Sequence, residues 1–184
     1  MLIAFVCLLA SSLGTDVTTT YAKSKPVTKD FLMDKNKTYT FKSAGYMYNP
    51  YETLVFEQRD SYRFWRITKL TGDVDGGYEE KQSKNSYTFH RLGMQKSATT
   101  TVTTKPVKGK KYTNKYGSYV VVSTNATVKT KYKTFKNCMV TRVKEGENYT
   151  FYNYYAPHHG LVKAKQKYKN EWFTTVELIK VSNE

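Results

Sequence analysis

The sequence predicts a mainly β protein, a single antiparallel and strongly curved sheet that forms a half-barrel or barrel-like fold, with little helix. No stretch carries apolar side chains at helical spacing, whereas short alternating or β-branched runs recur between clusters of turn residues. The chain has 17 Tyr among its 184 residues, a composition that suits half-buried strands. About eight to ten such runs occur, which favours a sheet that curls or closes on itself.

The N-terminus reads as an export signal. Residues 2–9 form an apolar run that ends in small residues. A run this short cannot span a bilayer, which needs about 20 apolar residues, and it is typical of a secretory signal peptide. Thr20 and Ala22 supply a T-x-A cleavage pattern, so the mature chain is expected to begin at Lys23. Cys7 lies inside the apolar run behind bulky residues, so lipid attachment is not expected there.

This pattern divides the chain into three parts: a signal peptide over residues 1–22, a flexible lead-in over 23–30 and a single β domain over 31–184. Five runs predict strands in the first half of that domain, because they are short, rich in aromatic or β-branched residues and bounded by turn residues. They cover residues 38–41, 54–56, 62–67, 78–80 and 87–92. Arg63 shares a face with Trp65 and Ile67 in the third run, so the inward face there is undecided.

The second half predicts strands at residues 97–104, 119–123, 128–134 and 172–181, together with a closing hairpin over 135–163. Residues 97–104 are dominated by Thr and suit a strand or a linker, and their β preference favours the strand. Residues 128–134 alternate strictly, which predicts one wet face with Lys129, Lys131 and Lys133.

The closing hairpin carries a resemblance to a known family. Its residues read FKNCMV at 135–140 and YNYYAPHHGLVK at 152–163. They resemble the closing hairpin of a family of secreted bacterial proteins and lipoproteins, in which a GTFKNCV segment precedes YYYYAPGVGLVK. The residues that fit this pattern are Phe135, Asn137, Cys138, Tyr154, Tyr155, Ala156, Pro157, Gly160, Leu161, Val162 and Lys163.

Members of that family resemble the half-barrel of bacterial lipoprotein carriers, a sheet wrapped about a helix or plug. The resemblance therefore implies an extracellular or surface location and a concave sheet, and it implies no reaction. His158 stands where the family pattern has Gly, which removes a residue that tolerates positive φ.

The charge balance suggests a polyanionic partner. Cleavage after Ala22 would leave 30 basic and 14 acidic residues, a net charge of +16. Such a field favours nucleic acid, anionic wall polymers or lipid headgroups. The basic residues expected to contact a polyanion are Lys108, Lys110 and Lys111 in a loop over 105–115, and Lys129, Lys131 and Lys133 on the alternating strand. An excess of Lys over Arg also fits an exported protein that is simply lysine-rich.

The sequence offers little chemistry for catalysis. Cys138, flanked by Met139 and Val140, is interpreted as a buried core residue and not as a nucleophile. The pair His158 and His159 is interpreted as exposed loop residues, and residues 73–77 as an ordinary turn and not a calcium loop. No metal, no cofactor and no enzymatic activity are therefore expected.

We expect a non-enzymatic binding or structural module at the surface of a Gram-positive bacterium, secreted or wall-associated. Its expected partner is an anionic cell-wall polymer or membrane surface, and nucleic acid would bind only non-specifically. The alternative is a carrier or sensor that holds an apolar or lipid-like ligand in the concave face of a half-barrel.

Overall fold

A computed structural model describes residues 28–44, 51–59, 62–68, 76–92 and 98–183. Within these ranges the protein is all-β, and no helix occurs. Twelve strands follow one another along the chain: β1 (Lys37–Ser43), β2 (Tyr51–Arg59), β3 (Tyr62–Ile67), β4 (Gly77–Gln82), β5 (Ser86–Leu92), β6 (Ala98–Thr103), β7 (Lys111–Asn114), β8 (Gly117–Lys129), β9 (Thr134–Glu145), β10 (Tyr149–Ala156), β11 (Gly160–Tyr168) and β12 (Glu171–Asn183). The described residues contain no helix with the length and hydropathy needed to cross a membrane.

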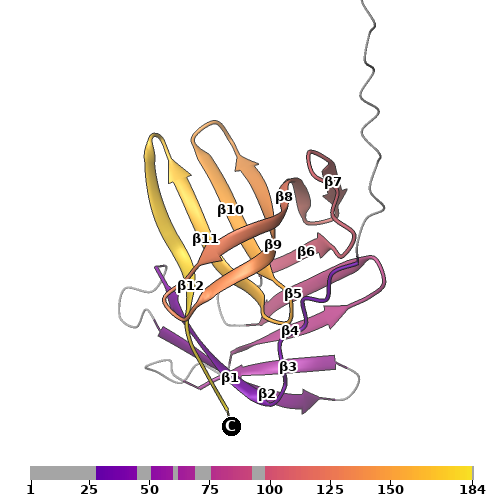
Figure 1. Cartoon of the computed structure of the whole chain (residues 1–184), viewed down its shortest axis with the longest axis vertical. Helices are drawn as coiled ribbons and strands as arrows, with labels where there is room; N and C mark the ends of the chain where they lie inside the picture. The colour runs from indigo at the N-terminus through magenta and orange to yellow at the C-terminus, as the bar shows by residue number, and fades with distance from the viewer. Residues whose placement is uncertain (1–27, 45–50, 60–61, 69–75, 93–97, 184) are drawn as a thin grey trace, which may run out of the picture.

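All twelve strands belong to one antiparallel sheet that is nearly closed into a barrel, in the order β6-β5-β4-β3-β2-β1-β12-β11-β10-β9-β8-β7. Strands that follow one another along the chain are paired, except β6 and β7, and β1 also pairs with β12. The single break in this circle of described strands lies between β6 and β7, which are consecutive but unpaired. Figure 1 shows the two six-strand halves, β1–β6 below and β7–β12 above, joined through β1 and β12. The predicted fold class is confirmed.

The interior is filled by large side chains that alternate along the strands. Trp65 and Tyr39 are fully buried and meet edge to face at 5.4 Å between ring centroids. A second buried cluster gathers around Phe31, with Tyr87 and Tyr155 packed against its ring. Aromatic side chains bury about 150–250 Å² each, so the burial of these five rings stabilises the curved sheet strongly.

An extended N-terminal segment, residues 29–33, crosses the inside of the sheet and acts as its plug. Lys29 N donates to Thr104 O at 2.7 Å, and His158 N donates to Asp30 O at 2.9 Å. Phe31 is fully buried. Part of this segment, residues 29 and 30, belongs to the predicted lead-in, whose residues 23–27 lie outside the described residues.

The structure corrects the predicted strand at residues 128–134. β8 ends at Lys129 and β9 begins at Thr134, with a tight turn between them. Thr130 Oγ1 accepts from Lys133 N at 3.2 Å and donates to Lys133 O at 3.0 Å. These local bonds offer the backbone an alternative to the ladder, which is why strict alternation did not make a strand.

Two smaller corrections concern the number of strands and the loop at residues 105–115. The structure has twelve strands where eight to ten were predicted. The loop contains a strand of four residues, β7, which pairs with the start of β8. A strand this short carries too little periodicity to be recognised in the sequence.

Candidate functional site

The predicted polyanion-binding lysines do not form one surface. Lys108, Lys110 and Lys111 lie at or just before the start of β7, and Lys111 pairs with Val120 on β8. The other three predicted lysines lie about nine or more residues beyond Val120, in and beside the β8–β9 turn, which corresponds to about 30 Å along a strand. All six side chains are exposed, but the structure brings the two groups to opposite ends of β8.

The sheet register assembles a different set of cations on the outer face of β7–β12. Directly paired residues share a face of a sheet. One row runs across six strands: Lys111, Val120, Arg142, Tyr152, Lys165 and Thr174. The next row runs from Lys144 through Thr150 and Lys167 to Trp172. We call Lys111, Arg142, Lys144, Lys165 and Lys167, with Tyr152 and Trp172, the outer cationic face.

No residue of this face is neutralised by a carboxylate of the described chain. The ion pairs among the described residues involve none of its five cations. Glu145 and Glu171 belong to the row of Tyr149 and Tyr168 and therefore lie on the opposite face, whereas Glu177 lies on this face in the row of Lys163. Lys163, which borders the outer cationic face, is paired with Glu177 at 2.8 Å.

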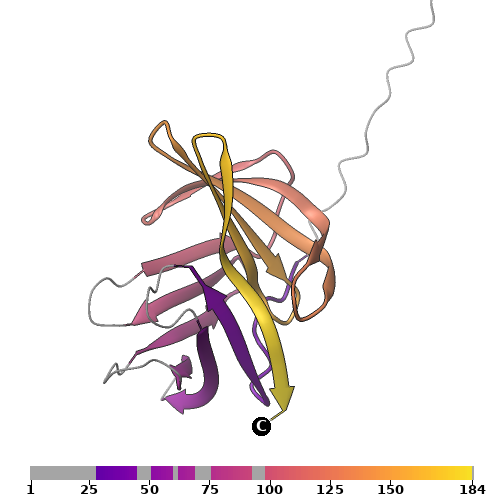
Figure 2. The same cartoon turned by 90° about the vertical axis from the view of Figure 1, so that its left-hand side faces the viewer.

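Aromatic rings accompany these cations. Trp172 is 52% exposed, and its ring meets that of Tyr152 edge to face at 5.3 Å. Lys167 Nζ lies 5.9 Å from the centroid of the Trp172 ring. Figures 1 and 2 show the β9–β10 and β11–β12 hairpin tips side by side at one end of the molecule, so this part of the face projects from the body.

Sequence reasoning missed this face, although the signal was present. Lys163, Lys165 and Lys167 alternate with small or half-buried residues, and Arg142 and Lys144 alternate in the same way. That is the same pattern that predicted the row at residues 129–133. What the sequence could not supply is the register that places the two runs next to each other with Lys111.

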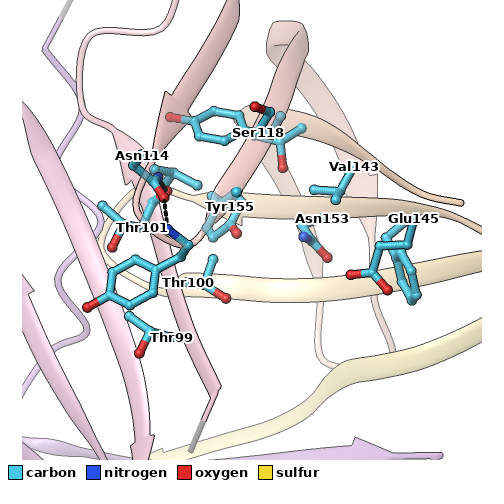
Figure 3. A pocket seen from close by; sticks show the side chains of 15 residues that line it. Thr99, Thr100, Thr101, Asn114, Ser118, Val143, Glu145, Asn153 and Tyr155 are labelled. Atoms are coloured by element: carbon cyan, nitrogen blue, oxygen red, sulfur yellow. Dashed lines mark hydrogen bonds between the residues drawn. The ribbon is translucent and has the colours of Figure 1, made fainter.

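A pocket of about 250 Å³ lies at the open seam of the barrel, between β6 on one side and β7–β10 on the other. Figure 3 shows Thr100, Tyr155, Asn153 and Glu145 around it. Its polar groups are mostly hydroxyls and side-chain amides, and Glu145 is the one charged residue among the described residues that line it. The pocket is therefore neither apolar nor cationic.

Two side-chain bonds hold the seam where the backbone ladder is missing. Asn114 Nδ2 donates to Thr101 O at 3.0 Å, and Thr103 N donates to Tyr119 OH at 2.7 Å. Figure 3 shows the first of these bonds at the edge of the pocket. These bonds satisfy backbone groups that an edge strand would otherwise leave free.

A buried carboxylate anchors the plug. Glu80 is 1% exposed and accepts from Met33 N at 2.9 Å, Trp65 Nε1 at 3.0 Å, Tyr87 OH at 3.0 Å and Arg63 Nε at 3.1 Å. Arg63 also donates to Met33 O. Burial raises the pKa of Glu80 above its ordinary value, and the four donors partly oppose that shift. All these interactions are structural. Arg63 lies on the inward face with Trp65 because its guanidinium forms an ion pair with Glu80.

The residues considered for chemistry lie in structural positions. Cys138 is fully buried, as predicted, and burial raises the pKa of its thiol to about 11. His159 Nδ1 lies 2.9 Å from Pro157 O, while His158 Nδ1 lies 3.4 Å from Asp30 Oδ2. The described residues contain no group of three metal-ligating side chains. The turn considered for calcium falls largely on residues 69–75, outside the described residues.

The hairpin motif itself forms parts of β9, β10 and β11. Asn137 has φ 56° beside a bulge in the β8–β9 ladder, and Gly160 has φ 61° at the start of β11. Other members of the motif are buried, among them Phe135, Tyr155 and Val162. The remaining members are Tyr154, Leu161 and Lys163, all half-buried, and Pro157 in the β10–β11 turn. These positions explain the motif by packing and backbone geometry.

Comparison with known proteins gives little further information. No family model and no curated protein matches the chain. A candidate exported protein with a YmcC-like fold from Bacteroides fragilis aligns with a TM-score of 0.41 and 12% identity, over 85% of this chain and 100% of that chain. A candidate lipoprotein from Parabacteroides distasonis aligns with a TM-score of 0.40 and 14% identity, over 84% and 99%. Likeness at this level carries no argument about function, and the family suggested by the hairpin motif stays a prediction.

Proposed function

We propose that the protein is an exported, non-enzymatic module that binds an anionic envelope polymer through the outer cationic face. The observation that supports this most strongly is the placement of five cations without a carboxylate partner on one face of β7–β12, with the neighbouring acidic residues Glu145 and Glu171 on the other face. Export itself rests on the apolar run and cleavage pattern at residues 1–22, which lie outside the described residues.

The spacing of these cations suits a flexible polyanion. Lys165 and Lys167 are two residues apart on β11, or about 6.6 Å, and Lys144 lies two strands away, or about 10 Å. These separations are close to the Debye length of about 8 Å at physiological salt, so the fields of neighbouring cations reinforce each other. Lysine acts as a point charge without a fixed fork, so no ordered anion site is needed.

The exposed rings favour a polymer with sugar or polyol units. Trp172 and Tyr152 present faces and edges beside the cations, where the C–H groups of a sugar could pack while Lys167 meets a phosphate. A polymer of phosphate-linked polyols or sugars, such as a teichoic acid, combines both features. DNA would bind the same face only through its phosphates.

The test compares two variants that remove equal charge from different places. In the outer-face variant, Lys144, Lys165 and Lys167 are replaced by Gln. In the turn variant, Lys129, Lys131 and Lys133 are replaced by Gln. Retention on immobilised wall teichoic acid is measured across a salt series, and circular dichroism checks that both variants fold.

In a plot of log affinity against log salt concentration, the slope for the outer-face variant should be smaller in magnitude than the parent's by about two to three. This is roughly one for each phosphate that a lysine no longer neutralises. The turn variant should change that slope by less than about one. Equal changes would show that net charge alone governs retention, and no change in either would remove the lysines from the function. Tighter binding of the parent to vesicles with anionic lipid than to the polymer would make a membrane surface the partner.

The carrier alternative has less support. A carrier needs apolar space inside the sheet, but the inner face of the described strands is packed with buried rings such as Trp65, Tyr39 and Tyr87. The pocket at the seam is polar and small.

A further inference from the structure

The seam pocket contains two buried hydroxyls that the fold leaves unsatisfied. Thr141 and Tyr155 are each 1% exposed, both line the pocket, and neither Thr141 Oγ1 nor Tyr155 OH has a hydrogen-bond partner among the described residues. The two groups are neighbours, but even a bond between them would leave one proton without an acceptor. Leaving even one such proton unpaired costs about 1–3 kcal/mol, so its burial beside the pocket requires an explanation.

The other lining residues narrow the class of partner for these hydroxyls. Asn153 lies two residues before Tyr155 on β10 and is paired with Thr141 on β9. Glu145, by contrast, is paired with Tyr149 at the far end of the pocket, and Thr100 lines the pocket from β6 (Figure 3). The lining presents donors, acceptors and one carboxylate, and no Lys or Arg is among the described residues that form it. This chemistry disfavours an anion, and the polar groups interspersed with the apolar ones disfavour a lipid chain.

The aromatic surface and the volume of the pocket further restrict the class of ligand. Phe151, Tyr119 and Tyr116 contribute ring surface to the same pocket, and Tyr116 is 50% exposed at its mouth. A volume of about 250 Å³ equals about eight waters at roughly 30 Å³ each. It is smaller than the usual drug-sized site of about 300–1,000 Å³. The aromatic rings of the pocket can pack against C–H groups, and its amides, hydroxyls and carboxylate can hydrogen-bond O–H groups. A sugar ring carries both kinds of group.

We propose that the seam pocket is a binding site for a neutral, hydroxylated ring, a single sugar unit free or within a glycan. Tyr155 and Thr141 hydrogen-bond its hydroxyls, and Asn153, which is paired with Thr141, orients it. The site is separate from the outer cationic face, because residues 151, 153 and 155 alternate with Tyr152 along β10 and face the other way. The inference therefore does not rest on the proposed function.

The seam also disfavours a peptide strand as the occupant. A peptide would have to pair with the free edge of β6. The Asn114 and Tyr119 side chains already occupy edge groups of Thr101 and Thr103, which interrupts the run of backbone groups that a new strand needs.

The test uses the double variant Thr141→Val with Tyr155→Phe, which keeps the shape of both side chains and removes both hydroxyls. Removing unsatisfied buried hydroxyls should leave thermal stability unchanged or raise it, so loss of binding cannot be assigned to unfolding. The matched control is Tyr168→Phe, which removes a tyrosine hydroxyl from a residue that lines neither the pocket nor the outer cationic face. Binding is measured by saturation-transfer NMR and calorimetry with the methyl glycosides of glucose, galactose, mannose and N-acetylglucosamine.

At least one glycoside should bind the parent and the control equally, and its affinity should fall about tenfold or more in the double variant, as expected when hydrogen bonds to a substrate hydroxyl are removed. Binding that survives in the double variant would overturn the site. No binding of any glycoside to the parent would show that water alone satisfies the hydroxyls and would overturn the ligand class, as would binding of a glycine tetrapeptide or inorganic phosphate that the double variant loses.

Two cross-checks let the two proposals fail separately. The outer-face variant should bind the glycoside like the parent, because its substitutions lie on the other side of the sheet. The double variant should keep the parent's salt slope on teichoic acid, because it removes no charge.

Discussion

Glu80 is the residue that ties the plug to the sheet, because its two oxygens accept from a backbone amide of the plug and from three side chains of β3 and β5. The sequence shows only two adjacent glutamates at 79 and 80. It gives no sign that one of them collects four donors, since those donors lie 7 to 47 residues away along the chain. Alternation does predict that the two point to opposite faces, and the structure agrees: Glu80 is buried and Glu79 is not.

The raised pKa of Glu80 leads to a pH prediction. Because the folded state holds the proton more tightly than the unfolded state, the contribution of Glu80 to stability is fully present below the ordinary pKa of 4.5 and is lost as pH rises through the folded value. Glu80→Gln cannot ionise, so its melting temperature should rise relative to that of the parent as pH increases above about 4.5. Calorimetry of both proteins across pH checks this, and a difference that shrinks with pH would contradict it.

His158 illustrates a residue in the wrong conformation for its type. Its φ is 57°, in the left-handed region that costs a side chain with a Cβ about 1 kcal/mol. His158→Gly should therefore raise the free energy of unfolding by about 0.5–1 kcal/mol, since its contact with Asp30 is an exposed one worth little.

The adjacent histidine supplies the control. His159 packs edge to face on Phe135 at 4.9 Å and on Tyr39 at 6.2 Å between ring centroids, so His159→Gly should destabilise the protein. Denaturant unfolding of both variants decides the matter, and the account of the turn is wrong if the two substitutions shift stability in the same direction.

At the scale of elements, the seam between β6 and β7 distinguishes this sheet from a closed barrel. Asn114 and Tyr119 bridge it with side chains. Tyr119→Phe with Asn114→Ala removes both bonds and should cost about 1–2 kcal/mol, because each bond contributes about 1 kcal/mol. Hydrogen exchange should show faster exchange of the Thr103 amide, with the β1–β12 ladder still protected. Equal loss of protection in both places would mean that the seam is not a local closure.

The β8–β9 hairpin shows where alternation fails as a predictor. Residues 128–134 alternate as well as any strand in the chain, yet the structure turns there because the Thr130 side chain closes the turn. By contrast, the Thr-rich run at 97–104 has an ambiguous pattern, and residues 98–103 of it form β6. The β-branched residues of this run favour a strand, although the run shows no alternation of polar and apolar residues.

At the scale of the whole molecule, the fold class could be predicted from the sequence and the proposed binding surface could not. Short β runs and the lack of helical periodicity are local features that can be read from the sequence. They are enough to predict an antiparallel curved sheet. The outer cationic face depends on the register of six strands, which joins Lys111 to Lys167 and Trp172 at the far end of the domain sequence, and register is a tertiary property. The seam pocket likewise exists only because the twelve-strand circle opens between β6 and β7.

The two tryptophans provide a direct test of the outer cationic face. Trp172 is 52% exposed on that face, whereas Trp65 is fully buried and donates to Glu80. Their two indole N–H signals are followed in ¹⁵N–¹H NMR spectra while a short glycerol-phosphate oligomer is added at low salt. We predict that the Trp172 signal shifts with the oligomer, that the Trp65 signal stays in place, and that added salt reverses the shift. A Trp172 signal that does not move while the oligomer binds elsewhere, for example at the amides of the β8–β9 turn, would contradict the account.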